Sequence, residues 1–249
     1  MLRQISVFII GSIVGSFLNV CIHRLPRGES IIRPASRCPD CLKAIPWYDN
    51  IPILSFIMLG GRCRSCRAGI RFRYIVVEIL TAALFLVLYI YFGLSVRFFV
   101  NLVFTSLLIV ATFVDFEHQE IPDHVSIGGI CIGVAASLFT DLTFFGSIKG
   151  ALTGGAIIYL TGILGKAAFK KEAMGGGDVK LMAMIGAFLG WPLVVLTFFI
   201  APFFGAVVGI ISKLKYGQEV IPYGPYLSLG ALIALFFGDT ILQILIPPF

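Results

Sequence analysis

Charged side chains are scarce in this sequence of 249 residues. They make up 13% of it, against about 25% in an average soluble domain. Hydrophobic residues account for 58%, and the mean hydropathy is +0.99. Such a composition excludes an ordinary water-soluble domain. Because several apolar runs are about 20 residues long, the length that spans a bilayer, the sequence predicts a polytopic membrane protein.

Several catalytic and targeting signatures are missing as well. The sequence has no G-x-S-x-G element, which would carry a serine nucleophile, and no H-E-x-x-H element, which would hold a catalytic zinc. It shows no internal repeat of the kind found in many transporters. No small-residue cleavage site follows the first apolar run. We therefore interpret that run as a retained membrane anchor and not as a signal peptide.

What the sequence does contain is a series of apolar segments. The sixth is only about 18 Å long as a helix, so it either starts below the membrane surface or belongs to a re-entrant hairpin. Both interpretations require water or protein around its first residue. We predict an all-α fold with about eight transmembrane helices, at residues 5–21, 75–94, 98–114, 125–139, 148–164, 179–190, 193–212 and 226–246.

The basic residues predict the orientation of these helices. If the N-terminus lies outside, all of the 19 Lys and Arg residues except Arg3, Arg97 and Lys149 fall on the cytosolic side. The net charge of +6 is then a topology signal, and we predict no nucleic-acid partner. One cytosolic segment, 115–123 (DFEHQEIPD), is acidic and breaks the rule.

A polar insert between the first two segments carries two cysteine pairs. Cys38 and Cys41 (CPDC) and Cys63 and Cys66 (CRSC) have the spacing of a four-thiolate zinc site. A reducing cytosol would keep the thiols available for metal, which a module with so small a core needs for stability. We predict a structural zinc; free or disulfide-paired cysteines are the alternative. The predicted domains are a first helix (1–23), this cysteine module (24–73) and a membrane core (74–249).

Two aspartates lie at the edges of apolar segments, where burying an acidic side chain costs free energy. Asp115 ends the third apolar segment and Asp178 begins the sixth, both at the predicted cytosolic boundary. An ionisable group at such a depth is a functional candidate. Two facing carboxylates share a proton, so one can take a proton from water while the other donates to a scissile amide. The two residues are therefore predicted to be the catalytic pair of an aspartic protease.

The glycines before Asp178 suggest how a substrate would approach it. In AMGGGDVKL, the missing side chains allow an extended or unwound backbone to come close to another chain before the helix resumes. A substrate strand could pair with the bare backbone near Gly175 and Gly177. Because irregular backbone at membrane depth needs protein or water beside it, the motif predicts a hydrated cleft.

Two further acids are candidates for the same cleft. Glu78, in the second segment, would pair with a basic residue or line the cleft. Asp123 is interpreted as the N-cap of the fourth segment, with a direct part in the cleft as the alternative. From the pattern alone, a buried aspartate pair could equally serve a proton or cation pathway, so a transporter remains the alternative function. A non-enzymatic membrane scaffold around the zinc module is a third interpretation.

A set of longer motifs follows in order along nearly the whole chain. They are GSFLNVCIHRLPRGES, CPDC, PWYDNIPILSF, GRCRSC, RYIVVEIL, VDFEHQEIPD, GGGDVKLMAMIGAFLGW and IPYGPYLSLGA. Together they resemble the bacterial prepilin peptidases, also called type IV leader peptidases. The G-x-G-D element alone would be a weak signal, whereas the ordered set is highly specific.

The resemblance implies a G-x-G-D aspartyl endopeptidase of the bacterial inner membrane, with Asp115 and Asp178 as catalytic residues and the four cysteines as zinc ligands. Its substrates would be type IV prepilins or type II secretion pseudopilins, which have a basic leader and one hydrophobic helix. Cleavage would follow a glycine, with the cysteine module and the active site facing the cytosol. Many members also methylate the new N-terminus with S-adenosylmethionine, and the full cysteine module resembles those bifunctional members.

Overall fold

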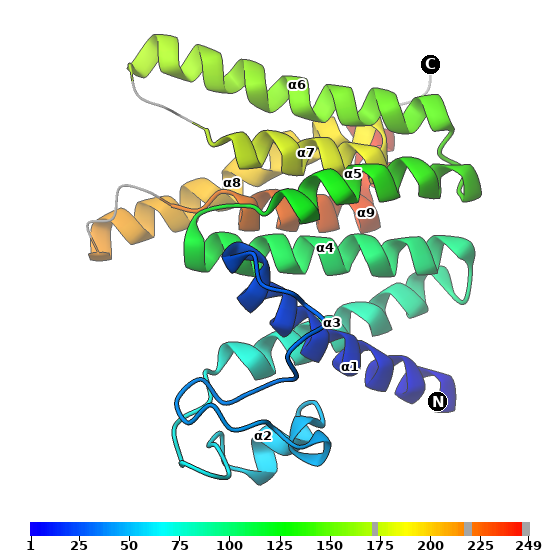
Figure 1. Cartoon of the computed structure of the whole chain (residues 1–249). Coiled ribbons are helices and arrows are strands. Elements are labelled where there is room, and N and C mark those ends of the chain that lie inside the picture. The colour runs from blue at the N-terminus through cyan, green and yellow to red at the C-terminus, as the bar shows by residue number, and fades with distance from the viewer. Residues whose placement is uncertain (171–173, 217–220, 246–249) are drawn as a thin grey trace. The chain divides into compact units, whose positions relative to one another are not determined.

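The computed structural model describes residues 1–170, 174–216 and 221–245. The described residues form helices and no strand (Figure 1). They divide into two compact units, unit 1 (Met1–Val110) and unit 2 (Ala111–Phe249). The α-helices are α1 (Leu2–Arg24), α2 (Leu54–Met58), α3 (Arg73–Phe92), α4 (Val96–His118), α5 (Asp123–Ala136), α6 (Phe144–Phe169), α7 (Gly176–Leu189), α8 (Trp191–Tyr216) and α9 (Gly224–Leu245). The short 3-10 helices are η1 (Leu25–Arg27), η2 (Trp47–Asn50) and η3 (Ser137–Phe139).

Each apolar segment predicted from the sequence falls on a helix to within two residues at its ends, except that residue 246 lies outside the described part of the chain. The all-α fold class is therefore confirmed. In the described part of the chain, 6 helices are long and apolar enough to cross a membrane: α1, α3, α4, α6, α8 and α9. The fourth and sixth segments fall in α5 and α7, which have 14 residues each. The full count of eight membrane spans therefore stays a prediction.

Local signals in the sequence explain several helix ends. Thr143 precedes α6, and its hydroxyl accepts a hydrogen bond from the backbone N–H of Gly146 at 3.1 Å, as an N-cap does. At the other end of a helix, Gly93 follows α3 and Gly190 follows α7, with φ of +60° and +81°. Because these positive φ values strain residues with a Cβ atom, glycine there stops the helix at low cost.

In unit 1, α1 packs closely against α3. A Cβ atom on Gly11 would lie 2.7 Å from the Cα of Ala82, and one on Gly15 would lie 2.8 Å from the Cα of Glu78. Small residues at a spacing of four let two helix backbones approach in this way. The next residue on the same face of α1 is Asn19, whose Nδ2 donates to the backbone carbonyl of Tyr74 at 2.9 Å.

In unit 2, α7 is the central helix. It packs against α5, α6, α8 and α9, and Leu181, Met182, Met184 and Ile185 are completely buried. At about 21 Å, α7 is shorter than a hydrocarbon core of about 30 Å. The neighbouring helices surround α7 with protein, which is one of the two environments predicted for so short a segment.

The start of α7 corrects one prediction. The glycines before Asp178 were expected to be extended or unwound. Gly175 is extended, with φ −78° and ψ 151°, but Gly176 and Gly177 already belong to the first turn of the helix. The helix therefore begins three residues before the predicted segment, and Asp178 lies inside its first turn.

The contact between α6 and α7 depends on two glycines that face each other. A Cβ atom on Gly186 would overlap the backbone carbonyl group of Gly150. We predict that Gly186→Ala lowers the free energy of unfolding by about 1–3 kcal/mol, the usual cost of overpacking a core. Thermal unfolding in detergent measures this. Gly128→Ala in α5 is the matched control, because its Cβ would meet nothing within 4 Å. Equal stability of the two variants would contradict the contact.

Candidate active site and metal centre

Asp115 lies near the end of α4 and is only 5% exposed. Its Oδ2 accepts a hydrogen bond from the backbone N–H of Gly224, the first residue of α9, at 2.8 Å. A Cβ atom at position 224 would lie 2.8 Å from the same oxygen, so glycine allows α9 to begin directly against the carboxylate. Sequence reasoning missed Gly224, since 109 positions separate it from its partner.

Asp178 is the third residue of α7. Its Oδ2 accepts a hydrogen bond from the backbone N–H of Gly175 at 3.2 Å, and its own N–H donates to the Gly175 carbonyl at 3.2 Å. These reciprocal bonds satisfy backbone groups that would otherwise lack a partner at a helix start. Asp178 therefore has a structural task in addition to any chemical one.

Asp115, Asp178 and Tyr223 form one electrostatic cluster in unit 2. The charge of Asp115 acts on Asp178, and the charge of Asp178 acts on the phenol of Tyr223, the residue before α9. Burial raises the pKa of Tyr223 to about 12, and the charge of Asp178 acts in the same direction. The phenol therefore stays protonated at neutral pH and keeps its hydrogen-bond donor. The structure places the two predicted aspartates within electrostatic reach of each other, beside a tyrosine that sequence reasoning did not select.

Contacts between α7 and the segment after α4 hold this cluster. A Cβ atom on Gly177 would lie 3.3 Å from the Cβ of Ile121, so the first turn of α7 packs closely on that segment. Lys180 of α7 also pairs with Asp123 at the start of α5, with Nζ and Oδ1 2.5 Å apart. The interpretation of Asp123 as an N-cap is wrong: Pro122 occupies the cap position, and Asp123 is the first residue of α5. Its carboxylate serves the ion pair instead.

A hollow of about 300 Å³ lies beside the glycines of α7. Residues of α6, including Tyr159 and Lys166, form one wall, and Gly175 and Gly176 form another. A Cβ atom on Gly176 would meet nothing within 4 Å. The backbone at the start of α7 is therefore accessible from this side.

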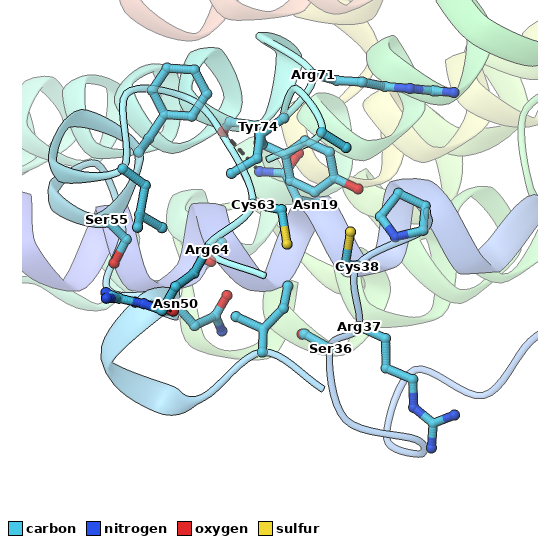
Figure 2. A pocket seen from close by; sticks show the side chains of 18 of the residues that line it. Asn19, Ser36, Arg37, Cys38, Asn50, Ser55, Cys63, Arg64, Arg71 and Tyr74 are labelled. Carbon is cyan, nitrogen blue, oxygen red and sulfur yellow. Dashed lines mark hydrogen bonds and ion pairs between the residues drawn. The ribbon is translucent and has the colours of Figure 1, made fainter. Parts of the chain in front are cut away.

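Glu78 lies in unit 1, in the first half of α3, and is 8% exposed. Its Oε2 accepts a hydrogen bond from the backbone N–H of Ile53 at 2.8 Å, and the Ser16 side chain also hydrogen-bonds to it. In the described part of the chain, Glu78 is therefore held by a backbone amide and a hydroxyl, and it lines a cavity in unit 1 (Figure 2).

The two cysteine pairs of the module have the same local geometry. The Cys38 N–H donates to the Lys43 carbonyl at 3.0 Å, and the Cys63 N–H donates to the Ala68 carbonyl at 2.8 Å. The fourth residue after each of these cysteines, Leu42 or Arg67, has a positive φ, of 58° and 62°. Each C-x-x-C segment therefore forms a tight knuckle that turns two sulfur atoms toward one point.

The four cysteine Sγ atoms of the two knuckles lie within 4.8 Å of one another, a cluster that could hold a metal ion. Those of Cys38 and Cys66, which come from different knuckles, are 3.7 Å apart. The backbone amides of Cys66 and Ser65 lower the pKa of the Cys63 thiol to about 7. Burial and the neighbouring thiols raise the pKa of Cys66 to about 12. The four thiols therefore lose their protons one after another, and a metal, which binds thiolates, would have to displace the remaining protons.

An ion pair links the segment between the two knuckles to the second knuckle. Arg64 donates from Nε and Nη2 to the two carboxylate oxygens of Asp49, at 2.7 and 2.6 Å. The guanidinium lowers the pKa of Asp49 below its ordinary value. The bidentate geometry fixes both side chains, which supports the predicted module in a region with little apolar core.

Comparisons with protein families cover both units. The model of the bacterial peptidase A24 N-terminal domain matches residues 9–92, which include the four cysteines and Glu78. The model of the type IV leader peptidase family matches residues 102–210, which include Asp115 and Asp178. Gly224 lies beyond both matches.

Individual proteins are similar over most of the chain. A prepilin leader peptidase/N-methyltransferase of Myxococcus xanthus is 39% identical over 87% of this chain, which spans 65% of that protein. Proteins with the same name from Pseudomonas aeruginosa and Bacillus subtilis are 34% and 35% identical, over 94% and 95% of this chain and 90% and 95% of their own lengths. No solved structure matches.

Proposed function

This chain belongs to the type IV leader peptidase family, and we propose from that premise that it is a prepilin leader peptidase and N-methyltransferase. It removes the basic leader of type IV prepilins or type II secretion pseudopilins by cutting after a glycine, and then methylates the new N-terminus. The observation that carries the peptidase proposal is that Asp115 and Asp178 lie within electrostatic reach of each other in unit 2. The transporter alternative is not favoured, because the matched family is one of peptidases.

The family and the six long apolar helices indicate a multi-pass protein of the inner membrane. We propose that the cysteine module and the aspartate pair face the cytosol, because the excess of Lys and Arg then lies on that side. A substrate with one hydrophobic helix would keep this helix in the bilayer and present its leader junction to the aspartates from the cytosolic side.

Cleavage requires one ionised and one protonated aspartate. The ionised carboxylate takes a proton from a water molecule as the water oxygen attacks the scissile carbonyl carbon. The protonated carboxyl donates its proton to the leaving nitrogen as the carbon–nitrogen bond breaks. The two residues then hold the proton in exchanged positions, and its return completes the cycle.

Each aspartate accepts a backbone N–H at the start of a helix, Asp115 from Gly224 of α9 and Asp178 from Gly175 before α7. Both the hydrogen bond and the helix dipole favour an ionised carboxylate, so either aspartate is suited to activate the water while the other donates the proton. The accessible backbone at Gly175 and Gly176 borders the hollow beside it, which suits an extended stretch of substrate near the scissile bond.

The four-cysteine cluster fits zinc. Sulfur atoms about 2.3 Å from a tetrahedral zinc lie about 3.8 Å apart, close to the 3.7 Å between the Cys38 and Cys66 sulfur atoms. We propose a structural zinc, because four thiolates would leave no open position for a substrate.

For methylation, we propose S-adenosylmethionine as the donor. When bound, it would supply a methyl group to the new N-terminal amine, which would release one proton.

The acid–base pair is tested by leader cleavage of a model prepilin in liposomes. Asp115→Asn and Asp178→Asn keep size and remove the titrating group, so each should lower the cleavage rate about 10²–10⁴-fold. Asp239→Asn, an exposed acid in α9, is the matched control and should cleave normally. Near-normal cleavage by either site variant would show that the acid–base assignment is wrong.

The role of Gly224 in positioning Asp115 predicts a particular kinetic change. Gly224→Ala places a Cβ atom against Oδ2 and should displace the carboxylate. We expect kcat to fall about 10- to 100-fold, since a misplacement of about 1 Å can have this effect, while KM stays the same. Steady-state cleavage kinetics measure kcat and KM separately, with Gly128→Ala as the control. A rise in KM alone would argue against positioning.

Metal analysis of the purified protein tests the zinc proposal. We expect about one zinc per chain. Cys38→Ser or Cys63→Ser should lose the metal and lower the unfolding temperature of unit 1, because the module has little other core. Cys131→Ser is the control, since Cys131 is an exposed free cysteine of α5 outside the cluster. Undiminished zinc in both cluster variants would refute the assignment.

A further inference from the structure

The hollow between α6 and the start of α7 is a mainly apolar space. Its volume of about 300 Å³ is at the lower end of the range typical of ligand sites, roughly 300–1,000 Å³. Besides glycines, Tyr159 and Lys166, the described residues that line it are Ile158, Ile163, Met174 and Val179. Such walls favour an apolar occupant, because apolar surface is then removed from water on both sides.

A single residue, Gly175, separates this hollow from the carboxylate of Asp178. Gly175 lines the hollow, and its backbone N–H donates to Asp178 Oδ2 at 3.2 Å. Gly175 and Gly176 are exposed and have no side chain that would keep another backbone away. A peptide that crosses the start of α7 over Gly175 would therefore pass the carboxylate on one side and the hollow on the other.

The first turn of α7 has three different faces. Because successive residues of a helix are about 100° apart, Gly176 and Val179 share one face, and both line the hollow. Gly177 is on a second face, where it packs on Ile121 of the acidic segment after α4. Asp178 is on the third. An apolar space and an acidic segment thus lie on two different sides of the residue proposed for catalysis.

The substrates proposed above have two chemically different parts that match these two sides. The basic leader precedes the scissile bond, and residues 115–123 match its charge with four acids and no Lys or Arg. The apolar helix follows the scissile bond, and the hollow matches its side chains. Because the residue before the scissile bond is a glycine, the side chain nearest to that bond belongs to the residue after it.

The hollow is accessible from outside the protein. Tyr159 and Ile163, in the wall that α6 forms, are 60% and 49% exposed. Lys166, in the last turn of α6, lines the same hollow, so the hollow lies near the end of α6 that is proposed to face the cytosol. A substrate helix in the bilayer would therefore reach it with its first residues.

We propose that this hollow is the specificity pocket for the first residue after the scissile bond, and that it takes an apolar side chain. The proposal rests on the peptidase function proposed above. The substrate backbone crosses Gly175 with the scissile carbonyl beside the aspartate pair, and the next side chain enters the hollow. Gly162 of α6 also lines the hollow, so the residue at position 162 determines how large a side chain the pocket admits.

Size selectivity tests the pocket. Leader cleavage in liposomes is measured with two prepilins that differ only in the residue after the scissile bond, alanine or phenylalanine. A Cβ atom on Gly162 would lie 3.7 Å from the Cβ of Met174, an ordinary contact, so a longer side chain would extend into the hollow. Gly162→Leu should lower kcat/KM at least tenfold more for the phenylalanine prepilin than for the alanine prepilin.

The matched control is Gly128→Leu in α5, where a Cβ atom would meet nothing within 4 Å. Its ratio of the two kcat/KM values should stay within twofold of the ratio for the unsubstituted protein. General damage to the fold lowers cleavage of both prepilins equally, whereas a filled pocket changes the ratio. An unchanged ratio in Gly162→Leu would overturn the proposal.

A second measurement leaves the hollow unaltered. A prepilin with a photoreactive diazirine analogue of leucine after the scissile bond is bound to full-length Asp115→Asn, which should cleave slowly. We expect cross-links within residues 158–166 or 174–179. Absence of label from both ranges overturns the placement. If the unsubstituted protein still cleaves prepilins, only the placement fails. If it cleaves neither prepilin, the peptidase function fails with it.

Discussion

A carboxylate buried in apolar surroundings must receive its hydrogen bonds from the protein, and this constraint organises the whole molecule. The buried acids Asp115 and Glu78 and the half-buried Asp178 each accept a hydrogen bond from a backbone amide, of Gly224, Ile53 and Gly175 in turn. A backbone donor brings no counter-charge, so each acid stays chemically available, which an ion pair with Lys or Arg would prevent. In two of the three cases the donor is a glycine, and at Gly224 the missing side chain is needed, because a Cβ atom there would lie 2.8 Å from the carboxylate oxygen.

The two units reach stability by different means. Unit 2 buries the apolar side chains of α7 among four neighbouring helices. These contacts between helices form its core and stabilise it. Unit 1 has the closely packed pair α1 and α3, but its inserted module relies on turns, an ion pair and four sulfur atoms.

Hydropathy and residue spacing predicted much of this arrangement. The apolar runs located every long helix, and the C-x-x-C spacing located the four-cysteine cluster, because both are local properties of the chain. Gly224 and Tyr223 were missed because their partners are remote in sequence, and no nearby pattern marks them. The N-cap interpretation of Asp123 failed because Pro122 takes the cap position and Lys180 supplies a distant partner. The hydrogen bond from the Ile53 amide to Glu78 was missed for the same reason, because 25 positions separate the two residues.

The crossing of α6 and α7 at Gly150 and Gly186 sets main chain directly against main chain. Side-chain packing can readjust when its surroundings change, whereas a backbone contact of this kind has almost no freedom to slide. Membranes differ in thickness, and outer helices respond by tilting. Because α7 packs against four helices and is held at this crossing, such tilting should displace its buried residues little. Its first turn, where Gly175 and Gly176 are exposed, is held instead by the close contact of Gly177 with Ile121.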